Sequence, residues 1–381
     1  EGNPLFLEQL LRNAEDHVED MPGSIQSLVQ ARLDRLDLRD RRALQAAAII
    51  GQRFPLAAIR SLAEDAAYDG APLLRHRLIR PEGDSYLFAH ALIREGVYSS
   101  LLAGNRRDLH RKAADWYGAS DATLRAQHLD RAEDSRAASA YLEAARAQAA
   151  AFYNDKALAL IDRGLEVANT DVDRSDLMLV QGDLLHDLGE IDRSGNAYQM
   201  ALACAPDDRA RCRAWIGLAA AERVMDHYSE ALALLESAQS AAALDLKAEL
   251  GRIHYMRGNL YFSQGRLEDC LAEHERALHF ARETGSVEAE ARALGGLGDA
   301  AYGRGLMLTA RDYFRRSVDL ARAHGLGRIE VANLPMAAIS NGFVLALAEG
   351  LEDGRSATKM AIRVGHKRAE MIAENCLYMM A

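Results

Sequence analysis

The chain has 381 residues, of which 49% are hydrophobic and 27% are charged, and its formal net charge is −10. So many apolar residues exclude a disordered chain, and no uncharged apolar run approaches the roughly 18 to 20 residues that span a bilayer. Four cysteines without a CxxC pair, together with the lack of a basic-then-apolar leader, favour a protein of the reducing cytoplasm without disulfides or structural zinc.

The first part of the chain predicts a small domain of short elements, because five of the seven prolines fall within residues 1–81. A helix is expected to begin at Pro4, with Asn3 as its N-cap. Further helices are predicted at residues 23–36, 39–50, 55–65 and 70–79. A hairpin with its turn at residues 81–84 follows, and then a helix that begins near His90. Helices followed by a hairpin are the layout of a winged helix, which we place at residues 22–104.

A repeated pattern of small and large residues marks the chain from residue 136 to its end. Four stretches fit the tetratricopeptide frame well, and weaker copies flank them. The strong copies contain Gly182, Leu185, Gly189, Tyr198 and Ala201; Trp215, Leu218, Ala219, Tyr228 and Ala231; Gly258, Tyr261, Gly265, Cys270 and Ala277; and Leu294, Leu297, Gly298, Gly305 and Phe314. The small residues let two helix backbones approach, and a large residue fills the gap between layers. Residues 136–381 therefore predict a right-handed solenoid of six helical hairpins and a truncated seventh.

The predicted fold is nearly all-α: a winged-helix domain with a small β-hairpin, followed by the tetratricopeptide solenoid. A HEAT-like array fits the repeat period but not the spacing of the Trp, Leu, Gly and Tyr positions. The single helix of the seventh copy would leave apolar residues uncovered, so we expect self-association through that end.

The predicted solenoid has a concave face onto which fixed positions of each first helix project. One of these positions is arginine in three successive copies. We expect a partner-binding surface made by Arg213, Arg252, Arg292, Tyr255, Asn259, Phe262 and Tyr302. Guanidinium groups suit carboxylates and phosphates, and aromatic rings add contact area. The expected partner is a protein or peptide with an acidic or C-terminal segment, or an anionic small ligand.

Three spaced motifs precede the repeats: GNPLFLE at residues 2–8, SLVQARLDRL at 27–36 and FAHALIRE at 88–95. In this order they resemble the region that follows the ATPase core in STAND-class signal-transduction ATPases. These are multidomain bacterial regulators, often fused to an adenylate cyclase or a LuxR-type DNA-binding domain, with a tetratricopeptide sensor behind. The resemblance implies that residues 1–21 end the helical lid of an ATPase and that residues 105–135 are connecting helices.

The resemblance also implies two nucleotide contacts in a longer parent protein. In such ATPases a proline at the end of the lid packs near the nucleotide base, and this role falls to Pro4. A histidine of the winged-helix motif contacts the β-phosphate of bound ADP, and this role falls to His90. The related plant motif is Met-His-Asp, whereas this chain has Ala89 and Ala91 around the histidine. A histidine at a strand-to-helix junction also suits a helix cap or a packed core position.

The chain itself has no GxxxxGK[ST] loop, so ATP and ADP are expected only in the parent protein, and no catalytic residue or cofactor in this chain. Gly296–Ala301 match a relaxed dinucleotide pattern, but no strand precedes them and helix packing explains them. His274 and His279 are five residues apart, about 140° around a helix, and so do not share a face for zinc. We expect no metal site.

These features predict the regulatory and ligand-sensing scaffold of a cytoplasmic signalling ATPase. Binding in the repeat groove would be relayed through the winged helix to a nucleotide-binding and output domain outside this chain. The alternative is a DNA-binding regulator that uses the winged helix, with Arg75–Arg80 at the end of a recognition helix. Nucleic acid is disfavoured as a partner because residues 1–120 are nearly balanced in charge and the acidic surplus lies beyond them.

Overall fold

The computed structural model describes residues 32–242 and 246–381, which separate into two compact units. Unit 1 contains the described residues up to Gln148 together with Asp155–Asn169, and unit 2 contains Ala149–Asn154 and Thr170–Ala381. Pro4 and the motif at residues 2–8 lie outside the described residues. The fold is mostly helical, and its repeats form a tetratricopeptide-like solenoid, as the sequence predicts.

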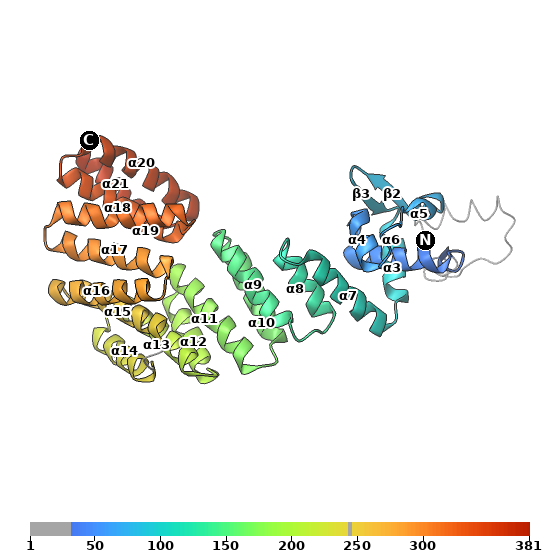
Figure 1. Ribbon diagram of the computed structural model, residues 1–381, viewed down its shortest axis with the longest axis horizontal. Helices are drawn as coiled ribbons and strands as arrows, with labels where there is room; N and C mark the ends of the chain where they lie inside the picture. The colour runs from blue at the N-terminus through green and yellow to red at the C-terminus, as the bar shows by residue number, and fades with distance from the viewer. Residues whose placement is uncertain (1–31, 243–245) are drawn as a thin grey trace. The chain divides into compact units, whose positions relative to one another are not determined.

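Unit 1 combines short helices with one small antiparallel sheet (Figure 1). Its elements are α3 (Leu38–Ile50), β1 (Arg53–Phe54), α4 (Leu56–Leu62), α5 (Ala71–Arg75), β2 (Ile79–Glu82), β3 (Ser85–Phe88), α6 (Ala91–Ser100), α7 (Ala103–Tyr117), α8 (Ala122–Arg131), α9 (Ala137–Ala150) and α10 (Asn154–Val167). The strand order is β1-β3-β2. The predicted hairpin is present, with Ile79 opposite Phe88, whereas the two-residue strand β1 was not predicted.

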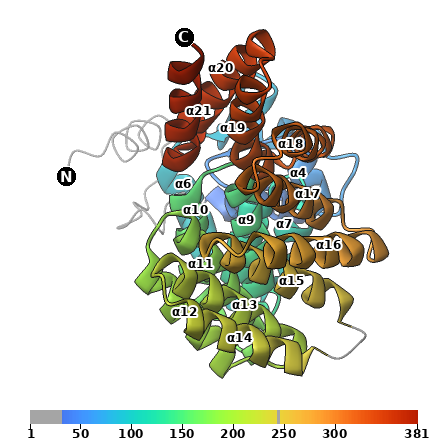
Figure 2. The same ribbon diagram turned by 90° about the vertical axis from the view of Figure 1, so that its left-hand side faces the viewer.

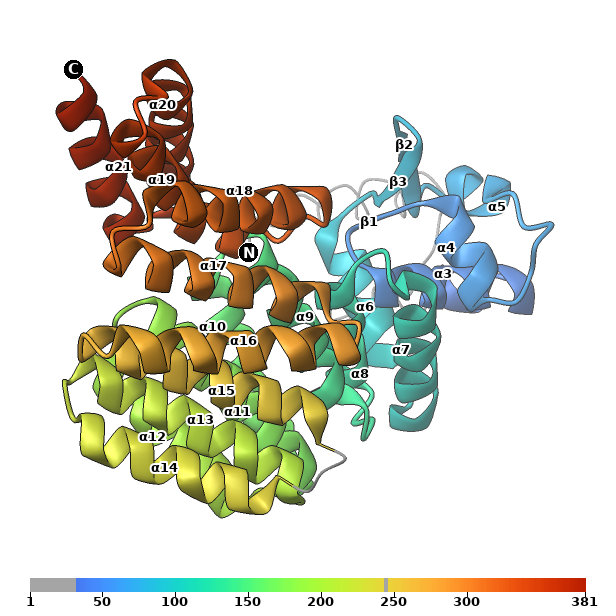
Figure 3. The same cartoon turned by 60° about the vertical axis from the view of Figure 1, so that its left-hand side comes forward.

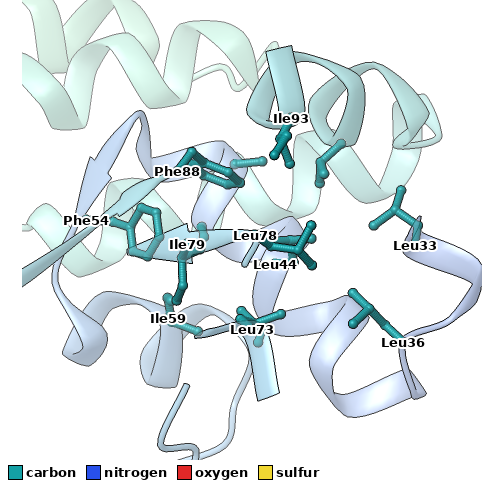
Figure 4. Packing of buried hydrophobic residues seen from close by; sticks show 14 of the residues in the cluster. Leu33, Leu36, Leu44, Phe54, Ile59, Leu73, Leu78, Ile79, Phe88 and Ile93 are labelled. Atoms are coloured by element: carbon teal, nitrogen blue, oxygen red, sulfur yellow. The ribbon is translucent and has the colours of Figure 1, made fainter. Parts of the chain in front are cut away.

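A single apolar core holds the sheet of unit 1 against its helices (Figure 4). Phe54 of β1 and Phe88 of β3 pack edge to face, with ring centroids 5.3 Å apart. Leu44 of α3 and Ile93 of α6 are fully buried in the same core. Because strands alternate their faces, Phe54 and Phe88 point inward while their neighbours are more exposed.

The helix predicted at residues 70–79 is too long, because α5 ends at Arg75. Arg77 adopts a left-handed conformation with φ of 49°, and the Leu78 N–H bonds back to the Leu73 carbonyl at 3.0 Å. Such a return bond terminates a helix. Residues 79–82 then belong to β2, so the segment Arg75–Arg80 does not end a recognition helix.

Unit 2 is a stack of antiparallel helix pairs, followed by α21. Its helices are α11 (Asp171–Asp187), α12 (Ile191–Ala203), α13 (Asp208–Val224), α14 (Tyr228–Ala241), α15 (Lys247–Ser263), α16 (Leu267–Glu283), α17 (Val287–Gly303), α18 (Met307–Ala323), α19 (Gly327–Phe343), α20 (Leu347–Val364) and α21 (Lys367–Met380). Each first helix contacts the first helix of the next pair, and the pairs follow one another through the stack (Figures 2 and 3). No described helix is long and apolar enough to cross a bilayer.

Close helix contact in unit 2 depends on glycines that face a large side chain. Tyr198 of α12 packs on Gly182 and Gly217, and Phe314 of α18 packs on Gly298. A Cβ at Gly298 would lie 2.7 Å from the Phe314 ring, which a real Cβ cannot tolerate without a shift. The glycines of the stretch 296–301 are therefore packing positions inside α17, as the sequence predicts.

His274 of α16 occupies the same packing position as Tyr198 and Phe314. It lies between Gly258 and Gly296 and is fully buried. Neither ring nitrogen has a hydrogen-bond partner among the described residues. Burial lowers the pKa of His274 to about 4, although the neighbouring Glu273 carboxylate opposes this change.

The turns inside the helix pairs use left-handed backbone conformations. Gly189, Gly265 and Gly305 adopt positive φ there, and glycine does so without steric cost. Asp226 and Leu345 occupy the equivalent turns of the second and last pairs, with φ of 60° and 61°. The helices of α15 to α18 have 17 residues each, so two of them already fill the 34 residues of a standard repeat.

Candidate binding groove

The concave groove of unit 2 is built from equivalent positions of the first helices α13, α15 and α17. Steps of three and four residues separate these positions, so they lie on one face of each helix. The sixth residues are Arg213, Arg252 and Arg292; the ninth are Ile216, Tyr255 and Gly295; the thirteenth are Ala220, Asn259 and Asp299; and the sixteenth are Arg223, Phe262 and Tyr302. All of them line one groove with a volume of about 1240 Å³. Helices α11, α19 and α21 complete its walls.

The arginine row, which consists of Arg213, Arg252 and Arg292, places three guanidinium groups on neighbouring helices. Arg213 forms an ion pair with Asp176 at 3.6 Å, and Arg292 forms one with Glu288 at 2.8 Å. Arg252 forms no ion pair or hydrogen bond with any residue that the structure describes.

The charge on Arg252 is poorly compensated by its surroundings. The surrounding protein dehydrates its guanidinium group and lowers its pKa, and Asp183 opposes this change. Arg213 and Arg292 lower the pKa of Arg252 further because their like charges repel it. An anion bound beside Arg252 would relieve this repulsion.

A second cationic region lies at the other end of the same groove face, where Arg223 of α13 and Arg368 of α21 both line the groove. Dehydration is the main cause of the lowered pKa of Arg223. The like charge of Arg368 lowers this pKa further, whereas Tyr255 raises it. The Arg223 Nε is buried without a partner among the described residues. No described residue forms an ion pair with Arg368 either.

Asp299 is the carboxylate of this second region. Dehydration raises its pKa to about 7, although Arg368 opposes the change. Asp299 therefore carries only part of a negative charge near neutral pH. The net charge of Arg223, Arg368 and Asp299 together therefore stays positive.

Tyr255 lies between the two cationic regions. It is the ninth residue of α15, between the arginine row and the row that contains Arg223, and it lines the groove. The same ring packs on His274, with centroids 5.5 Å apart. Asn259 stands one turn further along α15, and its side-chain amide has no hydrogen-bond partner among the described residues. The groove floor thus offers an aromatic face and an amide between two positive ends.

Arg328, near the start of α19, closes the groove against α11. Its guanidinium group pairs with Asp187 and donates to Asn154 Oδ1 at 3.4 Å. The same group lies 6.0 Å from the centroid of the Phe152 ring. Asn154 and Arg328 are 174 residues apart in the chain, so the stacked pairs bring distant segments together around the groove.

All seven partner-binding residues predicted from the sequence line this groove, and their role in binding stays a prediction. The sequence reasoning did not include Arg328, Arg368 and Asp183, which come from helices outside the three strong copies that it compared. His90 caps α6, where its Nδ1 accepts the Leu92 N–H at 3.2 Å. Its nucleotide contact is untested, and that of Pro4 falls outside the described residues.

The described residues suit binding more directly than metal chemistry. No three or more His, Cys, Asp or Glu residues in the described ranges are grouped so as to hold a metal ion. His274 is buried, whereas His279 on the same helix is exposed, so the two do not converge. The four cysteines are free thiols.

Comparison with known proteins identifies the repeats that carry the groove. Residues 249–323 match the tetratricopeptide repeat family. This stretch contains α16 to α18 and nearly all of α15, and therefore most of the predicted partner-binding residues. No curated protein matches the chain in sequence.

Many solved structures match the fold, among them the following two. A signal transduction ATPase with numerous domains (STAND) with a tetratricopeptide repeat sensor, from Pyrococcus horikoshii, is 15% identical with a TM-score of 0.68; it covers 94% of this chain, which spans 56% of that protein. The Cut9–Hcn1 hetero-tetramer of the APC/C is 13% identical with a TM-score of 0.51, over 98% of this chain and 59% of the other. At such identities the likeness shows the fold alone.

Proposed function

We propose that this chain is the sensor region of a multidomain signalling ATPase, and that its groove binds an anionic partner. The observation that carries the proposal is the pair of cationic regions around Arg252 and around Arg223 and Arg368, in a chain with a net charge of −10. Arginines that line a groove without an ion-pair partner among the described residues favour carboxylates or phosphates. A protein or peptide segment fits this groove, and so does an anionic small ligand. The proposal is tested by reversing the charge of the arginine row, which should abolish the binding of an acidic peptide.

The class of the parent protein is also proposed. The likeness in fold to the STAND protein with a repeat sensor supports it, together with the three motifs of the first hundred residues. In such a parent, binding in the groove would be relayed through unit 1, as a winged helix, to an ATPase domain and a cyclase or transcription output. ATP or ADP would be bound there and not by this chain alone. A cytoplasmic location follows from the same proposal.

DNA binding by unit 1 has weaker support. A recognition helix needs several exposed residues that reach base edges, whereas α5 has five residues. Self-association is supported by α21, whose Met371, Tyr378 and Met379 are exposed apolar side chains.

If unit 1 relays binding to an ATPase domain in the full-length parent, His90 should affect how long ADP stays bound there. His90→Ala should raise the ADP dissociation rate and the basal output, because a phosphate contact that holds the closed state is lost. The same change removes the cap of α6 and should cost about 1 kcal/mol of stability.

His90→Asn separates the two roles, because asparagine is a good helix cap but lacks the imidazole. Rapid ADP release from both variants supports the nucleotide contact. A wild-type dissociation rate in His90→Asn would show that His90 is only a helix cap.

A further inference from the structure

We infer that the groove has two separate anion subsites, and that its ligand is an extended peptide segment with a carboxylate at each end. This inference rests on the proposed function and specifies the ligand class of the same groove. The first subsite is Arg252, and the second is the pair Arg223 and Arg368.

The spacing of the subsites follows from helix geometry. Arg213 and Arg223 are the sixth and sixteenth residues of α13, so their rows are about 15 Å apart along the helix axis at 1.5 Å per residue. Arg252 lies in the first of these rows, one helix away. A compact anion such as a single carboxylate or phosphate therefore cannot contact both subsites at once.

An extended peptide matches this distance. Its residues advance by about 3.3 to 3.6 Å each, so side chains four residues apart stand about 13 to 14 Å apart. The subsites are somewhat further apart, because the axial distance of about 15 Å combines with the offset of about 8 to 10 Å between neighbouring helices, and the long glutamate and arginine side chains cover the difference. Tyr255 and Asn259 lie between the subsites along α15. The tyrosine ring can cover an apolar side chain of the peptide, and the Asn259 amide can both donate to and accept from its backbone.

Acidic side chains in the groove divide its positive surface into two separate subsites. Asp183 accepts the Tyr198 hydroxyl at 2.7 Å and faces Arg252 and Arg292. Glu288 holds Arg292. A ligand carboxylate therefore finds an unpaired donor in the first row at Arg252. In the second row the buried Arg223 Nε has no partner among the described residues, and Arg368 forms no ion pair with them.

Volume also favours a peptide over a small metabolite. The groove holds about 1240 Å³, above the roughly 300 to 1,000 Å³ of sites for small ligands. The ion pair of Arg328 with Asp187 bounds the groove on the α11 side, which favours a short segment.

The test is fluorescence anisotropy with two labelled, N-acetylated and C-amidated pentapeptides of equal composition. Glu-Ala-Phe-Ala-Glu has the predicted spacing, and Glu-Glu-Ala-Phe-Ala has adjacent carboxylates. We expect the spaced peptide to bind at least about tenfold more tightly. Arg252→Gln and Arg368→Gln, both at exposed positions, should each weaken it by about tenfold and together by about a hundredfold. The adjacent peptide should lose affinity in only one of the two variants.

Other outcomes overturn the inference in distinguishable ways. Equal binding of both peptides, or stronger binding of inorganic tripolyphosphate in competition, indicates one compact anion site; the proposed function then survives and the two-subsite ligand does not. Weak binding of every anion, unchanged by either substitution, overturns the inference and the proposed function together.

Discussion

Charge reversal of Arg252 and Arg292 is expected to abolish binding of an acidic peptide, with a loss of at least about a hundredfold in affinity. Both guanidinium groups lie on the groove face of neighbouring helices, and Arg252 forms no ion pair among the described residues, although the charge of Asp183 acts on it. In the variant Arg252→Glu with Arg292→Glu, two attractive charges become repulsive to a carboxylate, and Asp183 is no longer compensated. Like charges that face each other across an interface cost several kcal/mol, which corresponds to a loss of this size. Calorimetric titration with the spaced peptide measures the effect.

A matched control has the same change in charge outside the groove. Arg311→Glu with Arg355→Glu alters α18 and α20, and neither residue lines the groove or has a described ion-pair partner. This variant should keep wild-type affinity apart from a small salt-dependent effect. Both double variants should retain their helicity by circular dichroism. Equal losses in the two would show that net charge, and not the groove, controls binding.

Replacing His274 with phenylalanine is expected to stabilise the protein by about 1 to 3 kcal/mol at pH 7. His274 is buried with two unpaired ring nitrogens, and an unsatisfied buried polar group costs about that much. Tyr198 fills the equivalent position of another helix pair between Gly182 and Gly217, so a six-membered aromatic ring fits between two glycines. Urea unfolding monitored by circular dichroism measures the difference.

The stabilisation should grow as the pH falls. The pKa of His274 is lowered from 6.5 to about 4 in the folded state, so between these values the unfolded chain binds a proton that the folded chain does not. The wild-type protein therefore loses up to about 3 kcal/mol through this group between pH 6.5 and pH 4, and His274→Phe does not. His324→Phe, at an exposed position of unit 2 outside this packing layer, is the control and should not reproduce the growing difference. A constant difference between His274→Phe and wild type from pH 7 to pH 4 would contradict a buried neutral histidine.

The parts of the structure that the sequence predicts well are those with a local period. Gly182, Gly298 and Phe314 show the small and large positions of a helix pair, and the arginine row recurs at one position of three copies. Such positions need only the geometry of one helix and its neighbour. The hairpin of β2 and β3 is equally local, since its turn residues lie between its strands.

The remaining features depend on distances along the chain that no local pattern encodes. Arg368 lines the same groove as Arg223, and Arg328 contacts Asn154, only because small rotations between successive pairs add up around the groove. The early end of α5 depends on the left-handed Arg77, a conformation that non-glycine residues adopt rarely. The sequence pattern does not reveal His274 as the counterpart of Tyr198 and Phe314. A histidine is polar, and the packing position selects for the size of the side chain.

The most direct test of the groove as the binding site is photo-crosslinking. A photoreactive phenylalanine derivative at position 259 would replace Asn259 on the groove floor, and the same residue at position 275 would replace the exposed Glu275 of α16, which does not line the groove. With the labelled Glu-Ala-Phe-Ala-Glu peptide, the groove position should crosslink and the other position should not. Crosslinking at position 275, without crosslinking at position 259, would place the partner on the outer face of the solenoid and contradict the proposed function.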